Sequence, residues 1–129
     1  MGAPQVMETK DIDFRTFARS AGTVIAYKAG DTIFRRCDAA DFMWIVLSGS
    51  VEIESADRVI EIVGVNFAIG ILSLIDGLPR SATARALEDS ELIRIDPRQF
   101  AFMVEEMPNF DWYVMRQLAA RLRATNAAL

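Results

Sequence analysis

The spacing of hydrophobic and polar positions changes along the chain and divides it into three regions. In residues 11–18, Ile12, Phe14 and Phe17 stand among charged neighbours. This spacing predicts a short amphipathic helix. The segment Ser20–Gly22, built of small residues, is expected to end it.

The middle region has the pattern of short β-strands. Its apolar residues form brief runs or alternate with polar ones, and small or polar turn residues separate them. The expected strands cover residues 23–27, 32–34, 42–47, 51–55, 59–63, 81–87 and 92–95. Seven or so strands at this spacing predict a mainly β barrel or sandwich.

The last region is predicted to be two helices. Asp96 followed by Pro97 is typical of a helix start, and apolar residues then recur at helical spacing up to Pro108. Asn109 is expected to cap the second helix, which has Asp111 in its first turn.

The second of these helices carries two apolar stripes. The first consists of Phe110, Val114, Leu118 and Leu122, and the second of Trp112, Met115, Ala119 and Leu122. We expect one stripe to cover the β body and the other to meet a second copy in a homodimer. In the alternative, both stripes pack within one molecule.

Composition excludes several classes of function. The 129 residues include no histidine and a single cysteine, Cys37, which excludes Ser-His-Asp catalysis, histidine-based metal sites, disulfides and iron–sulfur clusters. The net charge of −4 argues against nucleic-acid binding by this chain alone. No membrane span or secretory signal is seen, so a cytoplasmic protein is expected. Residues 1–10 are interpreted as a tail or tag remnant and residues 11–129 as a single domain.

The most informative segment runs from Val63 to Ala86. Asn66 and Gly70 tolerate positive φ, and about one turn of apolar helix is expected between Gly70 and Pro79. Arg80 then stands among small and hydroxylated residues, where its guanidinium could hold a small anion such as a phosphate. The alternative is an ordinary surface arginine.

Spaced motifs across residues 23–123 carry a resemblance. They are Tyr27-Lys-Ala-Gly-Asp-Thr-Ile-Phe34, Phe42-Met-Trp-Ile-Val-Leu-Ser-Gly-Ser-Val51, Gly70 and Pro79-Arg-Ser-Ala-Thr83. In this order they resemble the cyclic nucleotide-binding domain family, which includes the catabolite activator protein and the regulatory subunits of protein kinase A. The resemblance implies a double-stranded β-helix, a jelly-roll-like β-roll, with a short N-terminal helix and two C-terminal helices.

The resemblance also implies a ligand, cAMP or cGMP, and no cofactor. The implied ligand-binding residues are Gly70, Ile71, Leu72, Arg80, Ser81, Ala82 and Thr83. Arg80 would pair with the cyclic phosphate, aided by Ser81 and the backbone of Ala82. Thr83 stands where some members use a hydroxyl associated with cGMP, and the C-terminal helix would cover the base.

Three positions depart from the family pattern. Ile71 replaces the glutamate that accepts the ribose 2′-hydroxyl, which predicts weaker binding. Cys37 replaces a glycine and is expected to be a small buried residue, with a redox sensor as the alternative. Asn66 replaces another glycine, a milder change because Asn tolerates positive φ.

The sequence therefore predicts a regulatory domain that senses a cyclic nucleotide and signals through residues 97–123. The first alternative is a degenerate module that serves protein interaction or dimerisation without ligand. The second is a sensor of another small anion or apolar effector. An enzyme is not expected, because no nucleophile is paired with a base. The DNA-binding helix-turn-helix of related transcription factors has no counterpart before Leu129.

Overall fold

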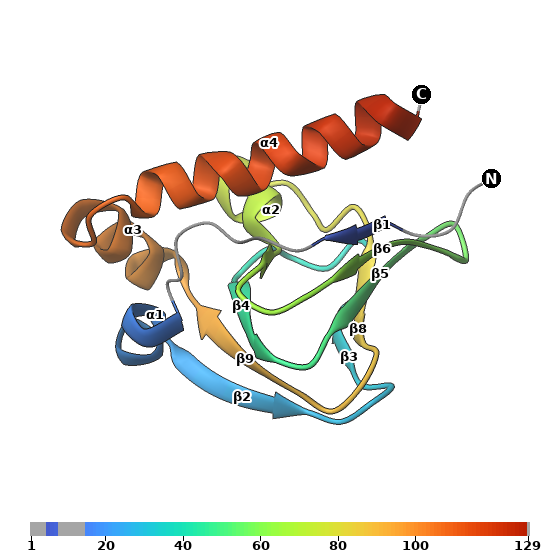
Figure 1. The fold of residues 1–129 in the computed structure, drawn as a ribbon, viewed down its shortest axis with the longest axis horizontal. Helices are drawn as coiled ribbons and strands as arrows, with labels where there is room; N and C mark the ends of the chain where they lie inside the picture. The colour runs from blue at the N-terminus through green and yellow to red at the C-terminus, as the bar shows by residue number, and fades with distance from the viewer. Residues whose placement is uncertain (1–4, 8–14, 129) are drawn as a thin grey trace.

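A computed structural model describes residues 5–7 and 15–128 of the chain, and Figure 1 shows a β body with helices along one end and one side. The elements, in chain order, are β1 (Gln5–Met7), α1 (Arg15–Ala21), β2 (Thr23–Tyr27), β3 (Thr32–Phe34), β4 (Met43–Ser48), β5 (Val51–Ser55), β6 (Arg58–Val63), β7 (Ala68–Ile69), α2 (Ile71–Asp76), β8 (Thr83–Ala86), β9 (Ser90–Ile95), α3 (Pro97–Glu106) and α4 (Phe110–Ala128).

The strands form two sheets, which confirms the predicted β-roll with flanking helices. One sheet has the strand order β1-β6-β5-β8-β3 and the other β2-β9-β4-β7. All pairings are antiparallel except that of β1 with β6, which joins Gln5–Met7 to residues 61–63 in parallel. In Figure 1, α4 lies across the β body, and α1 and α3 lie together at one end.

Alternation along β4 builds two separate cores. Trp44 and Val46 point between the two sheets, into what we call the inner core. Met43, Ile45 and Leu47 point to the other face, where they meet the helices in the outer core. Because successive side chains of a strand face opposite sides, a continuous apolar run is required here, and all five residues are buried.

The outer core fastens the helices to the four-stranded sheet. Phe110, Tyr113 and Val114 of α4 pack there with Met103 of α3 and Ala18 of α1. One of the two predicted stripes of α4, beginning with Phe110 and Val114, therefore covers the β body. Leu122 had been assigned to that stripe, but its side chain is 63% exposed, so the stripe ends at the half-buried Leu118.

The predicted start of α3 is confirmed in detail. The Asp96 carboxylate accepts a hydrogen bond from the Gln99 backbone N–H at 2.7 Å, and the Gln99 side chain accepts one from the Asp96 N–H at 2.9 Å. This reciprocal capping box, followed by Pro97, satisfies two donors that a helix N-terminus otherwise leaves free.

Several predicted boundaries were wrong by a few residues. The first helix continues to Ala21, so Ser20 does not end it, and the first residues of the predicted helix, 11–14, lie outside the described part of the chain. The strand predicted over residues 81–87 is limited to Thr83–Ala86, and the last strand starts at Ser90 rather than 92. Residues 81 and 82 precede β8, since the main chain of Arg80 just before them is hydrogen-bonded to Cys37 and Asp38.

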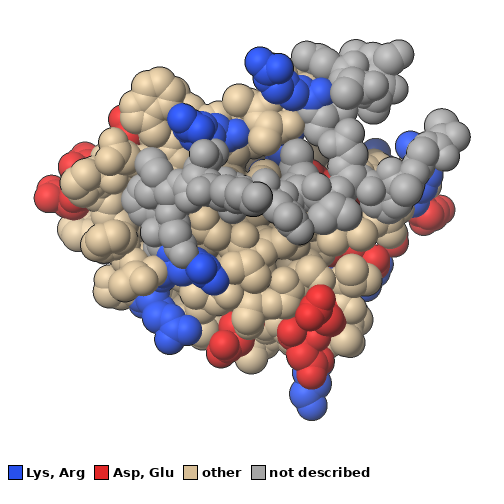
Figure 2. All heavy atoms as spheres, viewed as in Figure 1, with Lys and Arg blue, Asp and Glu red and all other residues tan. Residues whose placement is uncertain are grey.

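Charged side chains are spread over the face of the molecule seen in Figure 2. Lys and Arg lie along α4, at the lower left and at the bottom of the view, and Asp and Glu gather at the left, near α3, and at the lower end of the β body. Within the described residues, no helix is long and apolar enough to cross a membrane.

Candidate functional site

The site centres on Arg80, whose side chain is only 3% exposed and is therefore not the surface arginine of the alternative interpretation. Its Nη1 donates to the Gly70 carbonyl at 2.9 Å, and its Nη2 donates to the Phe42 carbonyl. The guanidinium also lies over the ring of Phe34, 4.5 Å from the centroid, and 5.4 Å from that of Trp44. Main-chain oxygens and aromatic faces therefore fix its position.

No carboxylate within the described ranges, 5–7 and 15–128, forms an ion pair with Arg80. Burial lowers the pKa of Arg80, whereas the more distant charges of Asp41 and Asp38 act in the opposite direction. Arginine nevertheless keeps its proton in proteins, so a buried positive charge is left without a paired negative one. Its Nε is fully buried and has no hydrogen-bond partner. A buried guanidinium without a paired negative charge favours binding of an anion that can reach it.

The main chain of Gly70 lies close to this guanidinium. A Cβ at this position would lie 2.8 Å from Arg80 Nη1 and 3.3 Å from the Phe42 carbonyl oxygen. The backbone is also left-handed here, with φ of 78°, at the N-cap of α2. Both conditions call for glycine. The predicted positive φ is confirmed for Gly70 and also for the buried Asn66, whose φ is 68°.

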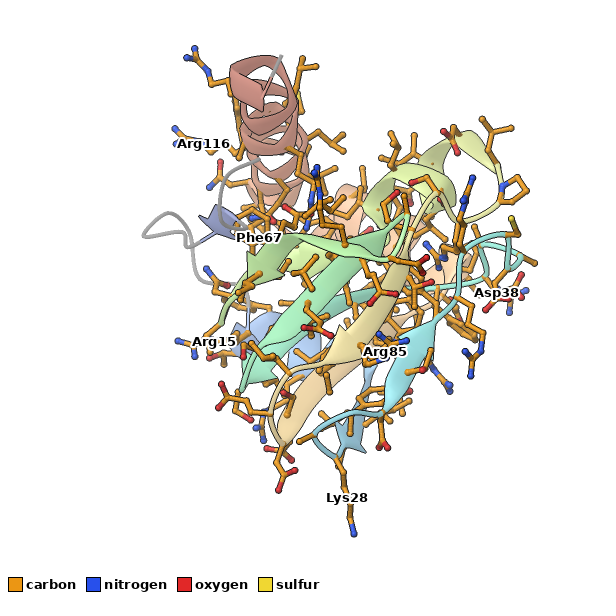
Figure 3. The ribbon with its side chains drawn as sticks, turned by 90° about the vertical axis from the view of Figure 1, so that its right-hand side faces the viewer. Arg15, Lys28, Asp38, Phe67, Arg85 and Arg116 are labelled. Carbon is orange, nitrogen blue, oxygen red and sulfur yellow. The ribbon has the colours of Figure 1, made fainter. Side chains whose placement is uncertain are left out.

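The loop before β4 holds the main chain of Arg80 from the other side. The Arg80 carbonyl accepts from the Cys37 N–H at 2.8 Å, and the Arg80 N–H donates to the Asp38 carbonyl at 2.9 Å. Figure 3 shows Asp38 in this loop, at the edge of the β body. Cys37 has φ of 74°, which explains the glycine of the family pattern. Its side chain is exposed, so the prediction of a buried residue was wrong.

The two residues after Gly70, Ile71 and Leu72, differ in their surroundings. The Ile71 side chain is 1% exposed and packs in the outer core, with α4 and β4. Leu72 is exposed. The position that holds glutamate in the family pattern therefore contributes an apolar contact to the helices and offers no acceptor.

After Arg80 the chain continues into β8 through Ser81, Ala82 and Thr83. Ser81 is exposed, and Ala82 is half-buried against the inner core. The Thr83 hydroxyl oxygen accepts from the Arg36 N–H at 3.1 Å, which leaves its own proton available to a ligand.

A cavity of about 240 Å³ lies on one side of Arg80. Its lining includes Tyr27, Trp44 and Arg94, and among the predicted ligand-binding residues only Arg80 borders it. Arg94 lies over the Phe42 ring, 4.4 Å from its centroid. Burial raises the pKa of the Tyr27 hydroxyl; the indole N–H of Trp44 opposes this shift, although it does not reach hydrogen-bond geometry.

Sequence reasoning missed the aromatic support of Arg80 and a second group of polar residues. Phe34 and Trp44 had been interpreted as strand and motif residues, and no contact with Arg80 was predicted for either. On α4, the buried Gln117 and the partly buried Arg121 bond to β7. The Arg121 side chain faces the sheets, where it pairs with Glu61 of β6.

The second predicted stripe of α4 is exposed. Trp112 is 56% and Met115 48% exposed, and Ala119 and Leu122 are exposed as well. The structure therefore leaves this apolar face uncovered by the described part of the chain.

Comparison with known proteins agrees with this geometry. A sequence model described as cyclic nucleotide-binding domain matches residues 24–107, which include β2 to α3 and the whole Arg80 region. This chain belongs to the cyclic nucleotide-binding domain family. The match covers more than half of the residues and identifies a regulatory domain of the kind found in the catabolite activator protein.

Individual relatives show how the domain is used elsewhere. The CRP-like cAMP-activated global transcriptional regulator of Mycobacterium tuberculosis is 26% identical over 79% of this chain and 48% of its own length. The crystal structure of the Thermus thermophilus catabolite activator protein is 27% identical, covers 88% of this chain and 55% of that one, and superposes with a TM-score of 0.77. A cAMP-bound EAL enzyme is 31% identical over 82% of this chain and 29% of its own, with a TM-score of 0.59.

The domain thus spans about half the length of the curated regulators it matches. In the EAL enzyme it corresponds to less than a third of the chain. The similarity therefore concerns the regulatory domain, and not the rest of either relative.

Replacing Gly70 by alanine tests how closely the backbone and Arg80 are fitted. We expect Gly70→Ala to lower the free energy of unfolding by about 2–4 kcal/mol, since left-handed backbone costs about 1–2 kcal/mol for alanine and the Cβ must displace Arg80. Urea unfolding measures the loss. Gly77→Ala is the matched control, because Gly77 has φ of 72° but no atom within 4 Å of its Cβ position. Equal losses in the two variants would contradict the close fit.

Proposed function

We propose that this domain binds a cyclic nucleotide, cAMP or cGMP, and reports its presence through α3 and α4. The observation that carries the proposal is the buried guanidinium of Arg80, which no carboxylate of the described residues neutralises. A cyclic phosphate has one negative charge and two exocyclic oxygens, which suit the planar fork of donors on an arginine. The cAMP-bound and cGMP-bound forms of the related EAL enzyme support this ligand class.

The ligand-binding residues in this proposal are those of the segment around Arg80: Gly70, Ile71, Leu72, Arg80, Ser81, Ala82 and Thr83. Arg80 pairs with the phosphate, and Ser81 and the backbone of Ala82 supply further donors. Thr83 keeps a hydroxyl proton for the nucleotide. The ribose receives no carboxylate, because Ile71 is directed into the outer core.

Signalling in this proposal is a shift between two positions of the C-terminal helices. Ile71, directly after Gly70, packs in the same core as Tyr113 and Val114 of α4. A ligand that changes the main chain at Gly70 would therefore change the packing surface of α4. The ligand shifts the equilibrium only as far as its affinities for the two positions differ. We place this activity in the cytoplasm.

A second candidate function is a dimerisation module that has lost its ligand. The exposed stripe of Trp112, Met115, Ala119 and Leu122 on α4 favours this function, since contiguous apolar surface on a helix marks interaction sites. A ligand-sensing domain and a ligand-free dimerisation module could both use this dimer interface. A measurement of nucleotide binding distinguishes the two functions.

Calorimetric titration with cAMP and cGMP tests the ligand. We expect binding by the natural sequence and a loss of at least roughly tenfold in affinity for Arg80→Ala, because a hydrogen bond to a charged group contributes about 1.5–3 kcal/mol. Arg85→Ala is the matched control, since Arg85 in β8 pairs with Glu54 at 3.1 Å, and Figure 3 shows it on the β body. Absence of heat and of thermal stabilisation at millimolar nucleotide would contradict the proposal.

The absence of a carboxylate at position 71 gives a second prediction, which concerns the ribose 2′-hydroxyl. Because Ile71 offers no acceptor, cAMP and 2′-deoxy-cAMP should bind with affinities within about threefold of each other, whereas loss of a hydroxyl from a site built to hydrogen-bond it costs far more. Competition titration of the two nucleotides measures the ratio. A tenfold or larger preference for cAMP would show that another group recognises the 2′-hydroxyl.

The proposed dimer can be tested by light scattering during gel filtration. We expect the mass of a dimer for the natural sequence and of a monomer for Trp112→Lys, which places a charge in the centre of an apolar interface. Phe102→Lys serves as control, because Phe102 on α3 is equally exposed but lies outside the stripe. A monomeric mass at high concentration for the natural sequence would refute the interface.

A further inference from the structure

Three residues of α4 that the ligand model does not use form a single stripe. Tyr113, Gln117 and Arg121 are spaced four residues apart, so they lie one above another on one face of the helix. Tyr113 is 2% and Gln117 3% exposed, and Arg121 is partly buried. We call these three residues the polar stripe. Buried polar groups are costly unless they are bonded, so their partners are informative.

Each of the three residues forms a hydrogen bond with the short segment that leads into Gly70. The Tyr113 hydroxyl donates to the Asn66 carbonyl at 2.7 Å. The Gln117 side-chain oxygen accepts from the Ala68 N–H at 2.9 Å, and Arg121 Nη2 donates to the Ala68 carbonyl at 2.5 Å. Both main-chain groups of Ala68 are therefore bonded to side chains of α4.

These bonds occupy the outer side of an edge strand. The strand β7 is the last in its sheet and pairs with β4 alone. On the β4 side the Phe67 carbonyl accepts from the Val46 N–H at 3.0 Å, so the next residue, Ala68, turns its N–H and carbonyl away from the sheet. Side chains of α4 thus take the place of a neighbouring strand at this edge.

Arg121 adds contacts that hold α4 in register. Its Nε pairs with the Glu61 carboxylate of β6 at 3.1 Å, and its guanidinium lies over the Phe67 ring, 4.9 Å from the centroid. Figure 3 shows Phe67 beneath α4, with Arg116 on another side of the helix pointing away from the β body. The polar stripe therefore faces the sheets, whereas the exposed apolar stripe does not.

The other end of the same segment belongs to the site. Gly70 is two residues after Ala68, and its carbonyl accepts the hydrogen bond from Arg80 Nη1. The main chain from Asn66 to Gly70 is thus bonded to α4 at one end and to the anion-binding arginine at the other.

We propose that Tyr113, Gln117 and Arg121 are positioning residues that join residues 66–70 to α4, so that a change at Arg80 moves the helix with the strand. This proposal rests on the proposed function for the ligand that starts the change. The hydrogen bonds between α4 and residues 66–70 are present without a ligand. It differs from apolar packing alone because directional bonds to Ala68 allow one register of α4 on β7.

Amide exchange measured by NMR tests the link in the natural protein and in Gln117→Leu and Arg121→Gln. The matched control is Arg123→Gln, an exposed arginine of α4 outside the polar stripe. Without ligand, the Ala68 amide should exchange roughly three- to tenfold faster in Gln117→Leu, with smaller increases through Gly70 and in α4, since one net hydrogen bond contributes about 0.5–1.5 kcal/mol. Protection of Ile93 in β9 serves as the internal reference for global stability.

With cAMP, the natural protein and Arg123→Gln should show exchange changes both in residues 66–70 and in α4. In Gln117→Leu and Arg121→Gln the segment should still respond, while the response of α4 falls by at least half. An α4 response equal to that of the natural protein would overturn the proposal. If the natural protein binds no nucleotide, the proposed function fails, and the ligand-free arm decides: a change confined to Ala68 overturns the link.

Discussion

The arrangement of this domain depends on one buried charge, the guanidinium of Arg80, and on the main-chain oxygens that hold it. Gly70 and Phe42 each supply a carbonyl, and Phe34 and Trp44 supply aromatic faces. A buried charge costs several kcal/mol unless it is compensated, and hydrogen bonds to neutral carbonyls compensate it only in part. The inner core is built around this group, with the Trp44 side chain buried on one face of β4. In the proposed function, a bound anion would relieve the remaining unfavourable electrostatic energy of this buried charge.

The replacement of a family glutamate by Ile71 couples ligand recognition to folding in a different way. A carboxylate at this position would be desolvated among Met43, Tyr113 and Val114, whereas isoleucine joins the outer core at no electrostatic cost. Under the proposed function, the site would lack a carboxylate contact with the ribose, while the Ile71 side chain adds apolar packing between α2, α4 and β4. In the proposed signalling, isoleucine at this position would strengthen the packing between α2 and α4 at the cost of affinity for the ribose. In the proposed function, the phosphate would then be the main group of the nucleotide that the site recognises.

Local patterns in the sequence were sufficient to predict most helices and strands, whereas the β-roll arrangement was predicted through the family resemblance. The apolar run of β4, the alternation in β5 and the Asp96-Pro97 start of α3 each specify their element within a few residues. The importance of Arg80 was also predictable, but only through the resemblance, since nothing local distinguishes a buried arginine from an exposed one. The error at Cys37 has a physical reason: the left-handed turn constrains the backbone, and a small residue in such a turn can still point to solvent.

Contacts between distant segments are what the sequence could not provide. Charge and helix spacing do not show that Gln117 and Arg121 contact an edge strand 49 or 53 residues earlier in the chain. The edge nevertheless imposes a requirement: the Ala68 N–H and carbonyl need partners, and among the described strands only β4 pairs with β7, on its other side. A helix that carries one acceptor and one donor a turn apart meets both needs at once. The same unsatisfied edge that would destabilise β7 therefore fixes where α4 lies, and through Gly70 it connects the helix to Arg80.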